Sequence, residues 1–267
     1  MEYRTLNNGV QMPQAGFGVF QIKDEEECIR VVLDAIDAGY RLIDTAQSYG
    51  NEEAVGKAIQ LSSVPREELF ITTKVWISHY GYEKAKASVE ESMRKLKTDY
   101  IDLVLIHQCL SDYYGAYHAL EDMYEEGKIK AIGISNFNES EYLEFIKNCN
   151  IIPSINQVEC HILYNKKELQ HTMKKYGTIL MGYSPFAQGK DNLFMDNDII
   201  NIKKKYNKTS SQVMLRYLIQ RGIPTIPKAS SVERLNENLD VFDFTLNDND
   251  MQIINSKNQN KSFFGWD

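Results

Sequence analysis

The sequence predicts a single α/β domain built as a (β/α)8 barrel, and three features support this prediction. Short, β-branched apolar runs alternate with longer amphipathic segments along almost all of the 267 residues, which is typical of repeated βαβ units. The polar residues that close four successive runs lie 30, 33 and 29 residues apart, at Asp44, Lys74, His107 and Asn136, and one such unit needs about 30 residues. No Gly-x-Gly-x-x-Gly follows the first run, which argues against a doubly wound dinucleotide-binding sheet.

Eight apolar runs are expected to form the strands of this barrel. They are residues 15–20, 40–44, 69–74, 101–107, 131–135, 154–157, 179–183 and 222–226. Upstream of them, Asn7, Asn8 and Gly9 lie between apolar residues, a pattern that predicts a β-hairpin capping the bottom of the barrel. No linker or shift of composition divides the chain, so residues 1–267 are expected to form one domain.

Charge and cysteine usage exclude several classes of partner. The net charge of −7 argues against nucleic acid or an anionic membrane as the main partner. The four cysteines are scattered without a Cys-x-x-Cys pair, which favours a reducing compartment. The start of the chain lacks the regions of a signal peptide, and no apolar run approaches membrane-spanning length. The protein is therefore expected in the cytoplasm, and the spacing of its five histidines predicts no metal site.

Four polar residues near strand ends are the candidates for catalysis, because barrel enzymes place their catalytic groups at the carboxyl ends of strands. Asp44, Lys74 and His107 each close an apolar run, and Tyr49 follows Asp44 in the loop DTAQSYGNE. Each residue alone is typical of a cap, a surface charge or a rim position. Together they predict a device for proton transfer.

The chemistry of this predicted device is carbonyl reduction. A nearby ammonium favours the phenolate, so Lys74 is expected to lower the pKa of Tyr49. Asp44 would keep Lys74 charged in a partly dry site. His107 would orient a carbonyl by a hydrogen bond. A proton donor over a carbonyl oxygen is what hydride reduction requires, because negative charge accumulates on that oxygen.

Longer strings surround these residues along nearly the whole chain and are similar to those of aldo-keto reductases. They are GFGVF, IDTAQSYGNEEAVG, ITTKVW, KLKTDYIDLVLIH, GKIKAIGISNF, INQVECH, YSPF and IPKASSVERLNEN. The chain resembles most the prokaryotic, diketogluconate-reductase-like branch of the family. The family's Asp, Tyr, Lys and His tetrad matches Asp44, Tyr49, Lys74 and His107.

The resemblance implies an NADPH cofactor that lies extended over the barrel mouth. The residues matched to the nicotinamide carboxamide are Ser135, Asn136 and Gln157, and the aromatic residue matched to the stacked ring is Tyr183. The residues matched to the adenosine 2′-phosphate are Lys228 and Arg234, and those matched to adenine are Glu237 and Asn238. Asn and Gln amides pair with a carboxamide, and Lys and Arg suit a phosphate.

Two departures from the family pattern affect the expected specificity. Ala229 stands where the family often has Ser, so one hydroxyl donor is missing, and we expect a relaxed NADPH preference that also admits NADH. Gln108 and Cys109 follow the histidine where Trp-Pro or Gln-Pro is common, so that pocket wall is expected to differ. The carbonyl substrate is expected to meet Phe20, Trp76 and His107, and family habit favours a monomer.

Two alternatives to the reductase remain open from the sequence, as does the role of the C-terminus. The alternatives are a non-catalytic nucleotide-binding barrel and a barrel aldolase that uses Lys74 for a Schiff base. Three large rings close the chain, at Phe263, Phe264 and Trp266. They are expected to dock, either on the outside of the barrel, which is the preferred interpretation, or as a short lid beside Trp76 and Phe20.

Overall fold

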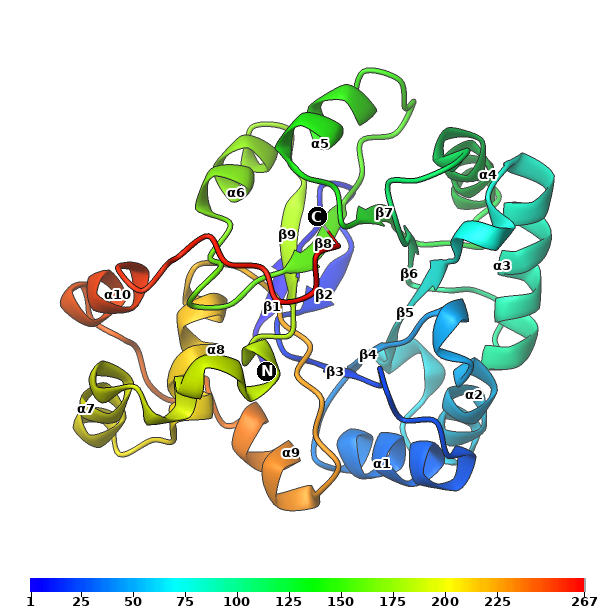
Figure 1. Cartoon of the computed structure of the whole chain (residues 1–267). Coiled ribbons are helices and arrows are strands. Elements are labelled where there is room, and N and C mark those ends of the chain that lie inside the picture. The colour runs from blue at the N-terminus through cyan, green and yellow to red at the C-terminus, as the bar shows by residue number, and fades with distance from the viewer. Residues whose placement is uncertain (267) are drawn as a thin grey trace.

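The computed structural model describes residues 1–266, and seven parallel strands form its main sheet. The sheet curls so that helices surround it (Figure 1). Its strands, in spatial and chain order, are β3 (Gly16–Gly18), β4 (Leu42–Asp44), β5 (Phe70–Val75), β6 (Leu103–Ile106), β7 (Ile132–Ser135), β8 (Ile155–Glu159) and β9 (Ile179–Tyr183). Seven of the eight expected strands are therefore confirmed, most of them with shorter bounds.

Helices follow the strands in regular alternation. The α-helices are α1 (Glu25–Asp37), α2 (Glu52–Leu61), α3 (Tyr82–Leu96), α4 (Tyr113–Glu125), α5 (Glu139–Phe145), α6 (Lys167–Lys174), α7 (Asn197–Tyr206), α8 (Ser210–Gln220), α9 (Val232–Leu239) and α10 (Asp248–Asn255). Short 3-10 helices lie in the connections, at η1 (Gln47–Tyr49), η2 (Arg66–Glu68), η3 (Ile77–His79) and η4 (Ala187–Met195). In the part of the chain that the structure describes, no helix is long and apolar enough to cross a membrane.

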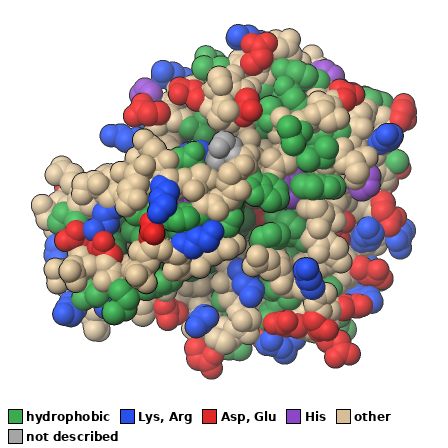
Figure 2. Space-filling view, viewed as in Figure 1, with side chains coloured by type: hydrophobic (Ala, Val, Ile, Leu, Met, Phe, Trp, Pro, Cys, Tyr) green, Lys and Arg blue, Asp and Glu red, His purple; other side chains and the backbone are tan. Residues whose placement is uncertain are grey.

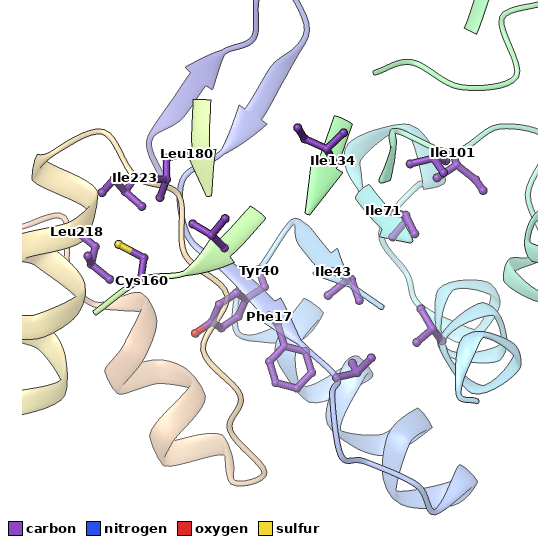
Figure 3. Packing of buried hydrophobic residues seen from close by; sticks show 14 of the residues in the cluster. Phe17, Tyr40, Ile43, Ile71, Ile101, Ile134, Cys160, Leu180, Leu218 and Ile223 are labelled. Atoms are coloured by element: carbon purple, nitrogen blue, oxygen red, sulfur yellow. The ribbon is translucent and has the colours of Figure 1, made fainter. Parts of the chain in front are cut away.

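Alternation along each strand divides the core into an inner and an outer cluster. Leu42, Leu103 and Leu105 point inward to the cluster enclosed by the sheet, whereas Ile43 and Val104 belong to the larger outer cluster. This division follows from the two-residue period of a strand. Figure 3 shows the outer cluster, where strand and helix side chains meet. The inner cluster fills the barrel beneath the candidate site.

The predicted N-terminal hairpin is confirmed. Strands β1 (Tyr3–Thr5) and β2 (Gln11–Pro13) pair antiparallel, and the turn between them uses Gly9 at φ 90°. Leu6 and Met12 belong to the inner cluster. The side chain of Asn8 donates to the Lys130 carbonyl over 2.8 Å. The hairpin thus closes the end of the barrel opposite the strand carboxyl ends.

The eighth expected strand, residues 222–226, is wrong as a regular strand. Only Thr225 pairs, with Ala15 on one side and with Gly182 of β9 on the other. Pro224 interrupts this segment and Pro227 directly follows it, and proline has no N–H to donate to a ladder. Their carbonyls still accept, with Gly182 N–H donating to Pro224 over 2.8 Å. The segment nevertheless links the two edges of the seven-stranded sheet, β9 and the start of β3.

Candidate active site

A cavity of about 460 Å³ opens at the carboxyl ends of the strands. Most of the predicted site residues line it, namely Phe20, Asp44, Tyr49, His107, Ser135, Asn136, Gln157, Tyr183 and Lys228. Figure 2 shows apolar side chains around the centre of this face, with Lys and Arg side chains beside them. Residues that are far apart in the chain meet here because parallel strands bring their carboxyl ends to one edge.

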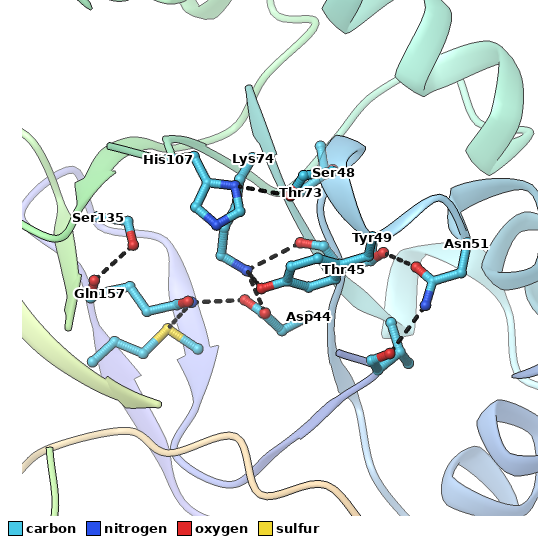
Figure 4. Close-up of polar contacts among 12 residues, drawn as sticks. Asp44, Thr45, Ser48, Tyr49, Asn51, Thr73, Lys74, His107, Ser135 and Gln157 are labelled. Carbon is cyan, nitrogen blue, oxygen red and sulfur yellow. Dashed lines mark hydrogen bonds and ion pairs between the residues drawn. The ribbon is translucent and has the colours of Figure 1, made fainter. Parts of the chain in front are cut away.

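Lys74 and Asp44 form a buried ion pair at the base of this cavity; Asp44 lines the cavity, whereas Lys74 is not among its lining residues. Each residue is 1% exposed, and Lys74 Nζ lies 2.5 Å from Asp44 Oδ1. The other carboxylate oxygen, Oδ2, accepts from Gln157 Nε2 over 2.7 Å, and Lys74 Nζ also donates to the Thr45 carbonyl over 3.1 Å. Figure 4 shows how these groups converge. A buried ion pair with its remaining polar atoms satisfied can persist without water.

Tyr49 completes this cluster from the short helix η1, which follows β4. Its hydroxyl lies 3.4 Å from Lys74 Nζ, and the ammonium is 5.1 Å from the ring centre. Burial opposes the charge on Lys74, but Asp44 and Tyr49 more than compensate, so the pKa of Lys74 is raised. Lys74 therefore stays protonated at neutral pH.

Lys74 acts to lower the pKa of Tyr49, as expected, through its charge and its hydrogen bond, but the phenol is also deeply buried. Burial raises the pKa of the phenol by more than the Lys74 charge lowers it, so the net direction is upward. The ammonium beside the phenol follows from the sequence, whereas the depth of the site depends on the fold around it. Tyr49 consequently carries its proton at neutral pH, which is the state that a general acid needs.

His107 lies beside Tyr49 and is neutral. The two ring centres are 5.8 Å apart in an edge contact, and Ser48 Oγ lies 3.5 Å from His107 Nδ1. Burial, followed by the charge of Lys74, lowers the pKa of His107 to about 3. A neutral imidazole keeps one N–H to donate and one lone pair to accept.

The residues matched to the nicotinamide lie together on three neighbouring strands, with Ser135 and Asn136 at the end of β7, Gln157 within β8 and Tyr183 at the end of β9. Ser135 Oγ donates to the Gln157 carbonyl over 2.8 Å, and the Tyr183 hydroxyl donates to Asn136 Oδ1 over 2.9 Å. Asn136 Nδ2 donates to the His107 carbonyl over 3.0 Å. Asn136 has a positive φ of 62°, a conformation that is uncommon outside glycine and clusters at functional sites.

The residues matched to the adenosine end lie in two places: Lys228 lines the cavity, and the others lie in helix α9. Lys228 is exposed and lines the cavity, whereas Arg234 is exposed in the first turn of α9 and is not among the cavity-lining residues. Glu237 accepts a hydrogen bond from Thr209 Oγ1 over 2.7 Å. Asn238 is 5% exposed. The cavity thus joins the tetrad to Lys228, and α9 follows directly beyond it.

Aromatic residues form the outer part of the site. Phe20 is 44% exposed and its ring centre lies 4.9 Å from that of Tyr49. Trp76 makes an edge contact with His107 at 5.0 Å and lines a neighbouring hollow of about 360 Å³ with Gln108 and Cys109.

The C-terminal rings dock, but the preferred expectation of packing on the outside of the barrel is wrong for two of them. Phe264 and Trp266 line the main cavity, and Trp266 lines the neighbouring hollow as well. The rings of Trp266 and His107 have centres 6.4 Å apart. Phe263 packs instead on His161, with 5.5 Å between ring centres.

Several cavity residues escaped the sequence analysis. They belong mainly to the segment after β9 and to the loop after β3, and they are Gln21, Ser184, Pro185, Phe186, Gln188 and Lys190. Gln21, Ser184 and Gln188 have positive φ values. The signal that could have located Gln188 and Lys190 is the Gly189–Lys190 pair shortly after a strand end, where barrel loops carry binding groups.

Comparisons with known proteins identify the family. The model of the aldo/keto reductase family matches residues 15–259. A glyoxal reductase of Bacillus subtilis is 45% identical over 96% of this chain and 92% of its own length. A 9,11-endoperoxide prostaglandin H2 reductase of Trypanosoma cruzi is 43% identical over 98% of this chain and 93% of its own.

Solved structures agree with these relatives. An aldo-keto reductase from a deep-sea metagenome superposes with a TM-score of 0.95 at 43% identity, covering 98% of this chain and 97% of that one. The Bombyx mori aldo-keto reductase in complex with NADP gives a TM-score of 0.92 at 33% identity, covering 98% and 94%. The chain therefore belongs to the aldo/keto reductase family, as its motifs predicted, and it is an enzyme of that family.

Proposed function

We propose that this protein is an NADPH-dependent reductase that converts aldehydes and ketones to alcohols, with Tyr49 as the general acid. The observation that carries the proposal is the position of Lys74 Nζ, between Asp44 Oδ1 at 2.5 Å and the Tyr49 hydroxyl at 3.4 Å, at the base of an open cavity. We further infer that the sheet is a closed (β/α)8 barrel in which residues 222–226 take the place of the eighth strand.

The proposed proton transfer uses only groups of the chain. As a carbonyl is reduced, negative charge develops on its oxygen, and Tyr49 donates its phenolic proton there. The ammonium of Lys74 stabilises the phenolate that results, and Asp44 holds Lys74 in its charged form. His107, which is neutral at neutral pH, donates an N–H to the same carbonyl oxygen and so fixes the orientation of the substrate carbonyl.

The residues at the cavity fit the nicotinamide cofactor that the family implies, which when bound would supply the hydride. The side chain of Gln157 donates its amide N–H to Asp44. Its side-chain oxygen, Oε1, is left to accept from the N–H of a carboxamide. The hydroxyl of Tyr183 is held by Asn136, so that its ring is fixed at the cavity wall as a stacking face. Lys228 would meet the 2′-phosphate as a point charge, and Arg234, Glu237 and Asn238 would surround the adenosine end.

The geometry disfavours the two alternatives. A Schiff-base lysine must be neutral to attack a carbonyl, whereas Lys74 is 1% exposed and paired with Asp44. A pure nucleotide sensor would have no use for a phenol and an ammonium directed at the same point of the cavity. The complete tetrad around that point therefore favours catalysis.

The substrate class that we propose is small aldehydes and dicarbonyls. The glyoxal reductase of B. subtilis is among the relatives at 45% identity, and the cavity wall is largely aromatic and apolar. One methylene in an apolar pocket changes binding by only about 1–3 kcal/mol, so we expect broad acceptance within this class.

A spectrophotometric panel tests this function. Purified protein is mixed with NADPH or NADH and with aldehydes, α-dicarbonyls or keto sugars, and the loss of reduced-nicotinamide absorbance is followed. We expect carbonyl-dependent oxidation of NADPH, fastest with small aldehydes and dicarbonyls. Cofactor binding without turnover of any carbonyl would instead support the nucleotide-binding barrel.

A further inference from the structure

Glu159, the last residue of β8, holds the C-terminal end of the chain through a buried carboxylate. Its side chain and that of His161 are fully buried, and Oε1 accepts from His161 Nε2 at 2.8 Å and from the backbone N–H of Phe263 at 2.9 Å. Oε2 accepts from Ser262 Oγ at 2.7 Å. Burial acts to raise the pKa of Glu159, but the hydrogen bonds from His161, Ser262 and Phe263 outweigh it, and the net pKa is lowered. The carboxylate is therefore charged at neutral pH.

Residues 262–266, which we call the aromatic tail, are connected to Glu159 mainly through the hydroxyl of Ser262. This hydroxyl donates to Glu159 and accepts from the backbone N–H groups of Phe264 at 3.3 Å and Gly265 at 3.0 Å. Gly265 has a φ of 63°, which completes a tight turn. One hydroxyl thus connects a buried charge to the turn of the tail.

The turn presents two rings to the site. Phe264 makes an edge contact with Tyr183 at 6.1 Å between ring centres, and the tilted ring of Trp266 has its centre 6.4 Å from that of His107. In Figure 1 the chain that leads from α10 to the tail, in red, runs across to β8. The tail therefore forms a wall on the side of the cavity where a carbonyl substrate would lie.

Other contacts also hold the tail and the segment before it. The backbone N–H groups of Gln259 and Lys261 donate to the Leu163 carbonyl at 2.9 and 3.3 Å, and Phe263 packs on His161. The ion pairs and lysine contacts are exposed. Lys190 Nζ donates to the Phe263 carbonyl at 3.2 Å, and Lys261 pairs with Asp191 at 2.6 Å, both side chains being about 40% exposed. Exposed ion pairs contribute little, because water and salt screen them. Hydrogen bonds to a buried carboxylate are stronger and costly to leave unmade. Among the described residues, Glu159 is thus the buried charged group that anchors the tail, at Ser262 and Phe263.

We propose that Glu159 is a positioning residue that acts through Ser262 to hold Phe264 and Trp266 as a wall of the substrate site, and that this wall lowers KM for those carbonyl substrates that carry an aromatic ring. The selectivity part rests on the reductase function proposed above. The anchoring part does not, so it can be tested separately.

Tryptic cleavage after Lys261 measures the anchor without any turnover. Ser262→Ala removes the connecting hydroxyl, and we expect cleavage of the native protein at this bond to become about tenfold faster, as expected for loss of a hydrogen bond to a charged group. Ser262→Thr keeps the hydroxyl and should restore the wild-type rate. Ser256→Ala is the matched control, because that hydroxyl bonds only within its own helical turn, to the Ile253 carbonyl.

Steady-state kinetics of the same variants test whether the wall contributes to the binding of aromatic substrates. In Ser262→Ala, KM for an aromatic aldehyde should rise about fivefold because its ring loses an ordered aromatic face, whereas kcat and KM for a two-carbon aldehyde should stay within about twofold. Glu159→Gln should behave like Ser262→Ala, and the double variant should be no worse than either single one if the two residues act in series.

Each result bears on one part of the proposal. Unchanged cleavage in Ser262→Ala would overturn the anchor. Faster cleavage with an unchanged ratio of KM values would overturn the role in selectivity. Should the wild-type protein reduce no carbonyl at all, the proposed function would fail, while the cleavage rates would still decide whether Glu159 holds the tail.

Discussion

Lys74 keeps its charge in a place that water barely reaches. An ammonium in an apolar interior would lose its proton, but the carboxylate of Asp44 at 2.5 Å and the phenol of Tyr49 at 3.4 Å hold it. Asp44 is held in turn by Gln157. Each member of the group is therefore stable only because its neighbours are present, so a change at one position should affect the others.

His107 gives a prediction for acid stability. Its pKa is about 3 in the folded protein against an ordinary 6.5, so the unfolded chain binds the proton first as the pH falls. Folding stability from this residue is complete above pH 6.5 and is lost progressively from there down to about 3. Between pH 6 and 5, wild type should lose roughly 1 kcal/mol more unfolding free energy than His107→Gln, as this linkage requires.

Urea unfolding at the two pH values measures this difference. Other groups titrate in both proteins, so only the difference between wild type and variant reports on His107. Equal losses in the two proteins would show that His107 is not held neutral in the folded state.

At the level of residues, the chemistry of the site could be predicted from the sequence but not its electrostatic balance. Asp44, Lys74 and His107 could be found because each closes an apolar run, and barrel strands bring such ends together. The pKa direction of Tyr49 could not, because burial of the phenol depends on the surrounding loops. The same holds for Glu159, whose partners Ser262 and Phe263 lie about a hundred residues away in the chain.

The turn that carries Tyr49 depends on one buried side chain. The side-chain amide of Asn51 donates to the Val19 and Ile22 carbonyls at 3.0 and 3.1 Å, while its oxygen accepts from the Thr45 hydroxyl at 2.8 Å. These bonds tie helix η1 and the start of α2 to the loop after β3. The local geometry of Tyr49 is thus fixed by contacts across two βα units.

We expect Asn51→Ala to destabilise the fold by about 2–4 kcal/mol, since it leaves two buried carbonyls and a hydroxyl without their partner. Asn236→Ala is the matched control, because Asn236 is exposed and its side chain bonds within its own helix, to the Val232 carbonyl. Its effect should stay within about 0.5 kcal/mol. Chemical denaturation measures both, and an equal effect of the two changes would contradict this account of the turn.

At the level of elements, a strand could be predicted where the side-chain pattern determines it. It could not be predicted where the backbone hydrogen-bonding capacity determines whether a strand forms. Residues 179–183 were predicted with the bounds of β9, because apolar residues define them. Residues 222–226 looked equally apolar, but Pro224 and Pro227 remove the N–H groups that a regular ladder needs. The path of the aromatic tail was not predictable either, because the hydroxyl of Ser262 gives no pattern in sequence.

For the whole molecule, the net charge of −7 does not favour an anionic cofactor, so local cations must provide the attraction. Lys228 at the cavity rim and Arg234 in α9 are the groups that we assign to the 2′-phosphate. Ala229 contributes no donor beside them. Preference for NADPH should therefore exist and depend mainly on these two residues.

Binding constants test this assignment. Wild type should bind NADPH more tightly than NADH, and Lys228→Met should weaken NADPH binding by about ten- to a hundredfold, the range for one charge-assisted contact. NADH binding should change little in the same variant, which makes it the internal control. Equal Kd values for the two cofactors in wild type would contradict the assignment.

The most direct test of the catalytic account is the Tyr49→Phe variant, assayed for NADPH binding and for carbonyl reduction. It removes the phenolic hydroxyl and with it the proton that we assign to the developing alkoxide, while the ring stays in place. Kd for NADPH should therefore stay within about twofold while kcat falls by about two orders of magnitude or more. Tyr3→Phe, which alters a half-exposed residue of the hairpin, should leave both values unchanged. A Tyr49→Phe variant that keeps kcat within about tenfold of wild type would show that another group donates the proton.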